Sequence, residues 1–561
     1  MSPQPLKVVL ISDFNVANLA GLLQNDAEPP ILEPVVAPYG QVIASLMPGN
    51  LAFWEPKPEV LVVWTRPEGV VQSFGRLLQY EQVDLEAVMR EVDEFAAAVL
   101  GACERAGSIL VPSWTSPSNH RGFGPLDMKA GLGVRDTLMR MNLRLSERLY
   151  QGSNVYVLDA HKWIEAVGPW AFEPKLWYTA KIPFGIDVFK EAVKDIKSAL
   201  QGVRGASKKL IVLDLDNTLW GGIVGELGWE NLRLGGHDHI GEAYLDFQKS
   251  LKALTRRGIL LAIASKNEEG VALGALEKHP EMLLRLKDFV GWRINWEDKA
   301  KNIADLVVEL NLGLESVVFI DDDPVERARV RESLMGVLVP EWPEDAMLYT
   351  KTLLGLRCFD APVLSQEDAS RAEMYASERR RREARVQGVC VEEWLRTLDI
   401  RVKVESLTEA NLQRTAQLLN KTNEMNLTTR RLTEVELLSW AQASDRRVWT
   451  YRVSDKFGDS GLTGILSLEI QGRMGTIADF VLSCRVMGRG VEETMLFAAV
   501  QYAESVGVKE LHAQYIPTAK NKPCLDFWKR SSFEHDERTS RFSWRFDRLY
   551  PRPDHVVIES T

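Results

Sequence analysis

The residues best placed to do chemistry are two aspartates, Asp214 and Asp216, in the run LIVLDLDNTLWGG over 210–222. Four apolar residues, Leu210–Leu213, precede Asp214, as in a buried strand of a parallel sheet. Open α/β sheets place their chemistry just beyond the carboxyl ends of such strands. We therefore predict phosphoryl transfer through an aspartyl-phosphate, with Asp214 as the nucleophile and Asp216 as the general acid and base.

Further polar residues follow the apolar run Ile259–Ala264 in an order that suits a phosphate site. Ser265 comes directly after this run, and its hydroxyl and the amides of the next helix start suit a phosphate oxygen. Lys299, in WEDKAKN, would neutralise the phosphate and keep Asp214 ionised, and Lys301 is the alternative. The sequence thus predicts Ser265 and Lys299 as phosphate ligands.

Three consecutive aspartates, 321–323, follow another apolar run, Val317–Ile320. Clustered carboxylates would repel a phosphate unless a hard cation lay between them. Mg²⁺ fits, because it takes few carboxylates and keeps several waters. We therefore predict a Mg²⁺ site built from four aspartates, Asp214, Asp216, Asp321 and Asp322.

The D-x-D-x-T run at 214–218 resembles the first motif of the haloacid dehalogenase (HAD) superfamily, which consists mostly of aspartate-nucleophile phosphatases. The serine, the lysine and the later aspartates resemble its other motifs in the same order. This resemblance implies that Thr218 also binds phosphate. About 40 residues separate the first two motifs, much of them helical over 243–257. There is little room for a large cap, and an open site suits a large or carrier-bound substrate.

The words around these motifs resemble a narrower group, the FkbH-like proteins of HAD subfamily IIIC. The resemblance covers about 30–550 and rests on LDLDNTLWGGIVGE, LAIASKNEE, FIDDDPVER, NKTNEMNLTTRR and LSCRVMGRGVEE. It implies an enzyme of polyketide-type pathways that takes a glyceryl unit from 1,3-bisphosphoglycerate and removes its phosphate. The product would be a D-glyceryl thioester on an acyl carrier protein. Many members read D-C-D where this chain has Leu215 between the aspartates.

A glycine-rich run, RVMGRG over 485–490, resembles the pyrophosphate loop of GNAT acyltransferases. Its glycines would let backbone amides approach a phosphate at the start of the next helix, 491–504. The later segment NKPCLDFWKRSSFE also resembles the GNAT pattern. We predict a site for a phosphopantetheine arm at Arg485, Gly488, Gly490 and Asn521. A plain strand-to-helix turn remains the alternative.

Cys484 directly precedes this loop. A helix start and Arg485 would favour its thiolate, so Cys484 is a candidate to accept glyceryl from the acyl phosphate and pass it to the carrier thiol. A buried cysteine that acts as a small hydrophobic residue is the alternative.

The polar segment NKTNEMNLTTRR spans 420–431. Asn426 is a candidate to bind the glyceryl hydroxyls, and Arg430 or Arg431 to pair with the distal phosphate. A helix exit followed by a turn is an equally good interpretation.

The amino-terminal run Val8–Ile11 leads into Ser12, which resembles the nucleophile position of SGNH hydrolases. The late D-x-x-H of those enzymes has no counterpart in Glu173–Trp177, which lacks histidine. A serine without a base is a poor nucleophile. We expect a catalytically degenerate domain with a scaffolding or carrier-docking role.

Apolar runs alternate with helical stretches through the first two thirds of the chain, which is typical of parallel α/β sheets. The first block has runs at 8–11, 60–63, 109–111 and 155–158, and the second at 210–213, 259–264, 317–320 and 337–339. We predict an α/β fold: an SGNH-like domain over 1–203, a Rossmann-like HAD domain over 206–345, a linker helix within 346–394 and a GNAT-like α+β domain over 395–550.

The bulk composition is that of a globular protein, with 561 residues, 45% of them hydrophobic and 26% charged. The net charge of −10 argues against a nucleic-acid partner, and no apolar run is long enough to span a membrane. Five scattered cysteines predict a cytoplasmic protein without a disulfide framework. The alternatives are a stand-alone Mg²⁺-dependent phosphatase, an acyltransferase that uses coenzyme A, and a non-catalytic docking platform.

Overall fold

The computed structural model describes residues 5–49, 52–117, 120–362 and 391–560. Two compact units make up the chain, Met1–Val203 and Arg204–Thr561. The helix predicted over 365–385 lies outside the described residues. Within the described residues, none of the helices combines the length and apolarity that crossing a bilayer requires.

The first unit is built on a five-stranded sheet in which every pairing is parallel, in the order β2-β1-β3-β4-β5. Its strands are β1 (Leu6–Ser12), β2 (Leu32–Val36), β3 (Val60–Trp64), β4 (Ser108–Pro112) and β5 (Val155–Leu158). β2 is the strand that apolar runs alone did not predict, because Glu33 and Pro34 interrupt it at the sheet edge. The predicted parallel α/β architecture is confirmed here.

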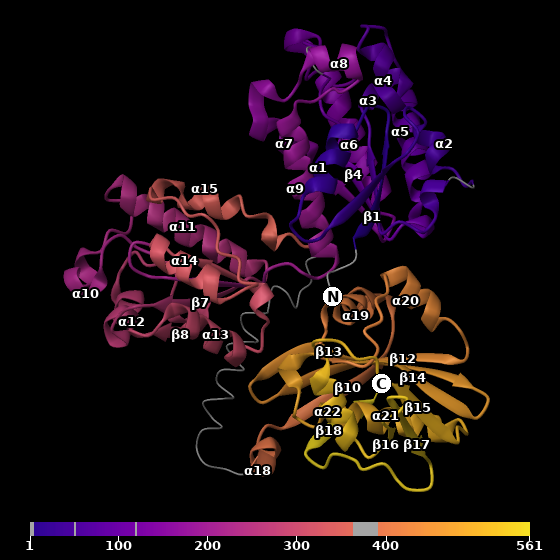
Figure 1. Cartoon of the computed structure of the whole chain (residues 1–561), viewed down its shortest axis with the longest axis vertical. Helices are drawn as coiled ribbons and strands as arrows, with labels where there is room; N and C mark the ends of the chain where they lie inside the picture. The colour runs from indigo at the N-terminus through magenta and orange to yellow at the C-terminus, as the bar shows by residue number, and fades with distance from the viewer. Residues whose placement is uncertain (1–4, 50–51, 118–119, 363–390, 561) are drawn as a thin grey trace. The chain divides into compact units, whose positions relative to one another are not determined.

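Helices cover both faces of this sheet (Figure 1). Alternate strand residues divide between two cores, so that Val8 and Leu10 pack on one face and Val9 and Ile11 on the other. One face meets α1 (Ala17–Asn25), α7 (Ala160–Val167) and α9 (Ile186–Val203). The other meets α2 (Val42–Leu46), α4 (Gln72–Leu77), α5 (Leu85–Leu100) and α6 (Val134–Leu149). The short helices α3 (Pro67–Val70) and α8 (Pro174–Ala180) also belong to this unit.

A four-stranded parallel sheet in the order β8-β7-β6-β9 forms the middle of the chain. The strands are β6 (Leu210–Leu213), β7 (Leu260–Ser265), β8 (Phe289–Ile294) and β9 (Val317–Ile320). α10 (Val224–Leu227), α11 (His239–Arg256), α12 (Glu269–Lys278) and α15 (Tyr349–Leu354) pack on one face, and α13 (Lys299–Glu309) and α14 (Pro324–Ser333) on the other. β6 and β9 are buried on both sides, as central parallel strands are.

Two details of the middle domain differ from the sequence expectation. Residues 337–339 form no strand, because only Leu338 bridges to Val318. Tyr349, Leu353 and Phe359 are buried in the core that includes β6. The domain therefore continues to about residue 359, and the linker is shorter than predicted.

The carboxyl-terminal part holds a mixed nine-stranded sheet, ordered β16-β17-β15-β14-β13-β12-β10-β18 with β11 beside β14. Its strands are β10 (Ile400–Ser406), β11 (Met425–Asn426), β12 (Arg446–Asp455), β13 (Gly458–Gln471), β14 (Met474–Leu482), β15 (Glu510–Gln514), β16 (Glu534–Asp536), β17 (Arg541–Arg545) and β18 (Val556–Ser560). Its helices are α18 (Val391–Arg396), α19 (Glu409–Lys421), α20 (Glu434–Ala441), α21 (Val491–Ser505) and α22 (Lys522–Arg530). Because β18 pairs with β10, the domain extends beyond the predicted limit at 550.

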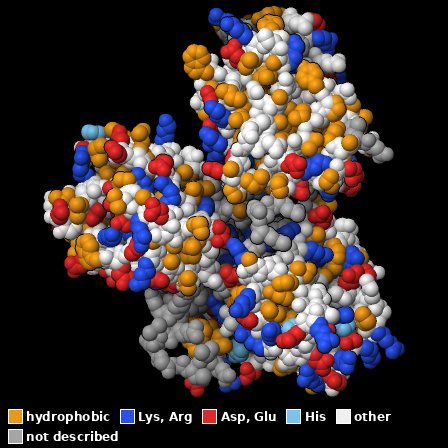
Figure 2. Space-filling model, in the orientation of Figure 1, with side chains coloured by type: hydrophobic (Ala, Val, Ile, Leu, Met, Phe, Trp, Pro, Cys, Tyr) orange, Lys and Arg blue, Asp and Glu red, His pale blue; other side chains and the backbone are white. Residues whose placement is uncertain are grey.

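Acidic and basic side chains are interspersed over the face shown in Figure 2. The chain has 68 Lys and Arg against 78 Asp and Glu. On the face shown, neither acidic nor basic side chains form a broad patch, and a protein surface that binds nucleic acid typically has a basic one.

Candidate active site

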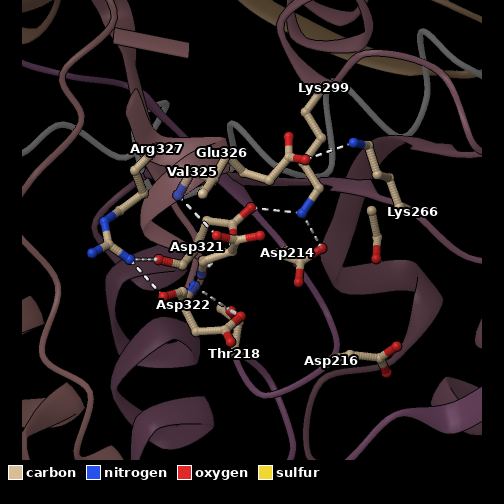
Figure 3. A network of polar contacts seen from close by, with 12 residues as sticks. Asp214, Asp216, Thr218, Lys266, Lys299, Asp321, Asp322, Val325, Glu326 and Arg327 are labelled. Atoms are coloured by element: carbon tan, nitrogen blue, oxygen red, sulfur yellow. Dashed lines mark hydrogen bonds and ion pairs between the residues drawn. The ribbon is translucent and has the colours of Figure 1, made fainter. Parts of the chain in front are cut away.

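The site begins where β6 and β9 end side by side. Leu213 pairs with Ile320, and the backbone N–H of Asp214 donates to the Ile320 carbonyl at 3.0 Å. The residues that follow these strands, Asp214 and Asp321, therefore leave the sheet at the same edge (Figure 3). Asp321 is fully buried, and Asp214 nearly so.

Lys299 joins these two carboxylates. It is the first residue of α13, whose start is fixed by Asp298 accepting from the Ala300 N–H. Its Nζ lies 2.8 Å from Asp214 Oδ1 and 2.6 Å from Asp321 Oδ2, and its side chain is 5% exposed. Burial alone would lower the pKa of Lys299, but the charges of Asp214 and Asp321 outweigh burial and raise it. The alternative, Lys301, instead forms an exposed ion pair with Glu297.

Three carboxylates surround the space beside this lysine. One oxygen from each of Asp214, Asp321 and Asp322 lies within 4.8 Å of the other two. Burial raises the pKa of all three, and the charge of Asp214 raises those of Asp321 and Asp322 further. Three acidic oxygens that one lysine cannot neutralise match the oxygen ligands that Mg²⁺ prefers, so the donor set fits this ion.

Thr218 and Ser265 complete the polar lining. The Thr218 hydroxyl donates to Asp322 Oδ1 at 3.0 Å and accepts from the Asp322 backbone N–H at 3.1 Å, which fixes the loop after β9. Ser265 is the last residue of β7, and its buried hydroxyl hydrogen-bonds Asp214. The structure thus brings Thr218, Ser265 and Lys299 together around Asp214.

Asp216 takes a different position. Its carboxylate is not one of the three grouped oxygens, and it lies apart from them in Figure 3. Oδ1 accepts from Trp220 Nε1 at 2.9 Å and the Val224 N–H at 3.0 Å, and Oδ2 accepts from Asn267 Nδ2 at 2.9 Å. The Asp216 carboxylate therefore lies outside the group of three carboxylates, which corrects the predicted four-aspartate cluster.

Two residues of this site were missed from the sequence. Asn267 orients Asp216 and also reaches Ser265 Oγ at 3.3 Å. Arg327 donates to the carbonyls of Asp321 and Asp322 at 2.8 and 2.7 Å, and so holds the loop that carries both carboxylates. Each lies inside a motif used for the prediction, ASKN and FIDDDPVER, but acts through another residue rather than through chemistry of its own.

The glycine-rich loop at 485–490 is occupied by the chain itself. Glu492, at the start of α21, accepts from the Gly488 N–H at 2.6 Å and is 1% exposed. Gly490 has a φ of +80°, and a Cβ there would lie 2.5 Å from His555 Nε2. The backbone turns as the glycine pattern predicts, but the Gly488 amide already has an acidic partner.

Cys484 does not have the activated thiol expected from the sequence. Burial and the nearby charge of Glu424 raise the pKa of its thiol, and Arg485 lowers it by less. These surroundings do not favour the thiolate, although the side chain is only partly buried and lines a pocket.

The predicted amide ligands are structural. Asn521 is fully buried, and its side chain makes four hydrogen bonds, with Tyr515, Thr518, Asn426 and Ile516. Asn426 is also fully buried, donating to the Thr422 carbonyl and accepting from the Thr429 N–H. Neither side chain is left to bind a substrate.

The two arginines of the same segment are also engaged. Arg430 forms a two-point ion pair with the buried Asp479 and stacks on Trp440. Arg431 donates to the Leu419 carbonyl and to Asn423. The interpretation of 420–431 as a helix exit and turn is the one that the structure favours.

Ser12 in the first unit has no histidine base among the described residues. Its Oγ accepts from the Phe14 N–H at 3.1 Å. Both ring nitrogens of His120 are hydrogen-bonded, Nε2 to the Leu78 carbonyl and Nδ1 to the Gly122 N–H. That this domain is catalytically degenerate stays a prediction.

Comparison with solved structures supports the phosphatase interpretation of the middle of the chain. The chain is similar to the N-terminal part of the protein BF1531 from Bacteroides fragilis, which contains a phosphatase domain and is complexed with Mg. Sequence identity is 29% and the TM-score 0.59, covering 64% of this chain and 95% of that one. The predicted Mg²⁺ agrees with the metal in that structure.

Weaker similarities involve N-acetyltransferases. The PaiA N-acetyltransferase of Thermoplasma acidophilum, in complex with coenzyme A, is 14% identical with a TM-score of 0.20, covering 26% of this chain and 99% of that one. The ribosomal-protein-S18-alanine N-acetyltransferase of Escherichia coli is 10% identical with a TM-score of 0.19, covering 25% and 89%. At such TM-scores the similarity carries no conclusion. No protein-family model matches the chain, and neither does any curated protein.

Proposed function

We propose that the chain is a Mg²⁺-dependent phosphotransferase of the HAD type, with Asp214 as its nucleophile. The observation that carries the proposal is the arrangement of Asp214, Lys299 and Asp321. A nearly buried carboxylate at a strand end is held 2.8 Å from an ammonium group that also neutralises its neighbour. Such a carboxylate is fixed in position beside a polar phosphate-binding wall, and the ammonium group of Lys299 opposes the effect of burial on its ionisation.

In the first step Asp214 attacks phosphorus, forming an O–P bond as the bond to the leaving oxygen breaks. Asp216 gives its proton to that oxygen, so the leaving group departs as a neutral alcohol. Lys299, Thr218 and Ser265 would stabilise charge on the phosphoryl oxygens.

In the second step Asp216, now ionised, takes a proton from a water molecule that attacks phosphorus. The O–P bond to Asp214 breaks, inorganic phosphate leaves, and both carboxyls return to their first state. Asp214, Asp321 and Asp322 would hold Mg²⁺, which when bound offsets the repulsion between these carboxylates and the phosphate. Asn267 keeps Asp216 oriented through both steps.

The substrate we propose is a glyceryl unit from 1,3-bisphosphoglycerate, delivered as a D-glyceryl thioester to the phosphopantetheine arm of an acyl carrier protein. Support comes from the sequence segments that resemble FkbH-like proteins, which extend from β6 to α21. The short insertion between β6 and β7, formed by α10 and α11, leaves little protein to enclose a small substrate. Because the surroundings of Cys484 do not favour its thiolate, direct transfer to the carrier thiol is the preferred route. The carrier sulfur attacks C1 of the acyl phosphate, a C–S bond forms, the C1–O bond to phosphate breaks, and inorganic phosphate leaves with the thiol proton. Asp214 then acts on the phosphate ester that remains at C3.

A stand-alone phosphatase is the second candidate. The Gly488 amide is taken by Glu492, and the Asn521 side chain is fully used inside the domain. Both observations favour a carboxyl-terminal domain without a role in acyl transfer.

Intact-protein mass spectrometry separates these functions. The enzyme, Mg²⁺ and 1,3-bisphosphoglycerate generated in place are incubated with a phosphopantetheinylated carrier protein. The proposal predicts a glyceryl-sized gain on the carrier, which becomes phosphoglyceryl or disappears with Asp214→Asn. A Cys484→Ser protein is expected to load the carrier at the normal rate. Phosphate release without any gain on the carrier would instead establish the stand-alone phosphatase.

A further inference from the structure

A pocket in the first unit lies outside the phosphoryl-transfer site and has no role in the proposed reaction. It has a volume of about 300 Å³ and is lined by residues that follow β3 and β4 and by α8. In the order β2-β1-β3-β4-β5 the chain reverses direction of winding between β1 and β3. Open parallel sheets bind ligands beyond the carboxyl ends of their strands at this switch point.

A charged cluster forms one wall of the pocket. Arg66, two residues past β3, lies 2.9 Å from Asp13 Oδ2 through Nε and 3.0 Å from Glu68 Oε1 through one terminal nitrogen. Its guanidinium carbon also lies 4.1 Å from the centre of the Trp177 ring. At Gly69 a Cβ would lie 1.9 Å from Asp13 Oδ2, so only glycine permits this packing. With one cation between two carboxyls, the cluster does not favour an anionic ligand.

Several hydrogen-bonding groups at the pocket are left open. The buried Glu68 Oε2 has no partner among the described residues, and it can accept a hydrogen bond. The hydroxyls of Thr65 and Ser116 accept from Trp114 Nε1 and from Arg135, so the proton of each remains to be donated. Trp177 and the largely exposed Tyr178 supply apolar surface beside these groups.

We propose that this pocket binds a small neutral polyhydroxy compound, a polyol or a monosaccharide. Ligand hydroxyls both donate and accept, so one hydroxyl can donate to Glu68 while others accept from Thr65 and Ser116. The aromatic residues then pack against the C–H groups of the ligand, as in small-molecule sites with few polar groups. Phosphorylated or carboxylated analogues meet the carboxyl of Glu68 and bind worse, since Arg66 is already paired with Asp13 and Glu68.

Saturation-transfer difference NMR on the full chain tests this inference independently of the phosphotransferase. The probes are glycerol, myo-inositol and D-glucose, with glycerate and glycerol 3-phosphate as anionic analogues. Asp214→Asn protein is used throughout, so that no probe is consumed. We expect signals from at least one neutral probe that weaken in variants of the pocket. A signal from an anionic analogue bound at the phosphoryl-transfer site should be unchanged in the same variants.

Two variants assign the signals to the pocket. Glu68→Gln replaces the open acceptor by a donor without changing shape, and Trp177→Ala removes the aromatic wall. Each is expected to weaken binding about tenfold or more. Trp170→Ala, at a 78% exposed tryptophan that does not line the pocket, is the matched control and should bind normally. Absence of binding by every neutral probe, or binding unchanged in Glu68→Gln protein that retains its near-UV circular dichroism, would overturn the inference.

Discussion

Replacing Lys299 by Met removes the single cation that Asp214 and Asp321 share. At an effective dielectric constant of about 20, ion pairs at 2.8 and 2.6 Å contribute about 6 kcal/mol of attraction each, before desolvation is counted. Without the ammonium, two carboxylates with oxygens within 4.8 Å repel each other by about 3 kcal/mol or more. Because a buried charge is left unpaired, we expect the middle domain to lose about 3–5 kcal/mol of stability at pH 7.

The pH dependence of this loss follows from the same carboxyls. Without Lys299 the pKa values of Asp214 and Asp321, already raised by burial, rise further. Above about pH 4 the folded variant then retains protons that the unfolded chain has released, so its stability falls as the pH rises. The loss of stability relative to the wild-type protein should be small near pH 4 and largest near pH 7. Mg²⁺ should reduce this loss by supplying positive charge.

Hydrogen exchange measured on the β6 peptide is the suitable assay, because it reports opening of the middle domain alone. Lys301→Met is the matched control, since Lys301 lies on the same helix but in an exposed pair with Glu297. It should change the opening free energy by less than about 0.5 kcal/mol. Equal exchange in the two variants, or a deficit independent of pH, would refute the assigned role of Lys299.

Three other changes test separate parts of the account. Asn267→Ala frees Asp216 from its amide partner, and we expect kcat for phosphate release to fall about 10- to 100-fold with an altered pH profile; an unchanged profile would argue against the positioning role. Burial raises the pKa of Glu492 to about 7, so ionisation of Glu492 costs stability as the pH rises from about 4.5 to 7. In Glu492→Gln this cost, at most about 3 kcal/mol, should disappear. Hydrogen exchange of the α21 peptide, used as the probe of denaturation at pH 5 and at pH 8, would measure it. Chelation by EDTA should abolish phosphate release and added Mg²⁺ restore it, whereas persistent activity in EDTA would exclude the metal role.

The middle domain could be predicted from the sequence because the residues of its candidate site follow directly after strands. Apolar runs locate β6, β7 and β9, and parallel pairing then brings Asp214, Ser265 and Asp321 to one edge. The position of Lys299 is harder to predict, because it depends on where α13 begins. Asp298 as the N-cap fixes that start, and so places Lys299 rather than Lys301 in the site.

The side chains predicted as ligands in the carboxyl-terminal domain are engaged within the fold for a common physical reason. Asn426, Asn521 and Arg430 are residue types that bind ligands well, but the same donors and acceptors also satisfy buried backbone groups and buried charges. Sequence shows the hydrogen-bonding capacity of a side chain and not whether the fold has already used it. Asp479, the partner of Arg430, lies 49 positions away, and the pairing of β11 with β14 brings it close.

The central claim is that Asp214 becomes covalently phosphorylated, and trapping that intermediate tests it most directly. Asp216→Asn protein, in which activation of water is blocked, is mixed with Mg²⁺ and an activated acyl or aryl phosphate, quenched in acid and digested. Peptide mass spectrometry should find one phosphoryl group on Asp214, within residues 210–222. The double variant that carries both Asp216→Asn and Asp214→Asn should show none. Phosphorylation at another residue, or phosphate release without any labelled peptide under single-turnover conditions, would contradict the account.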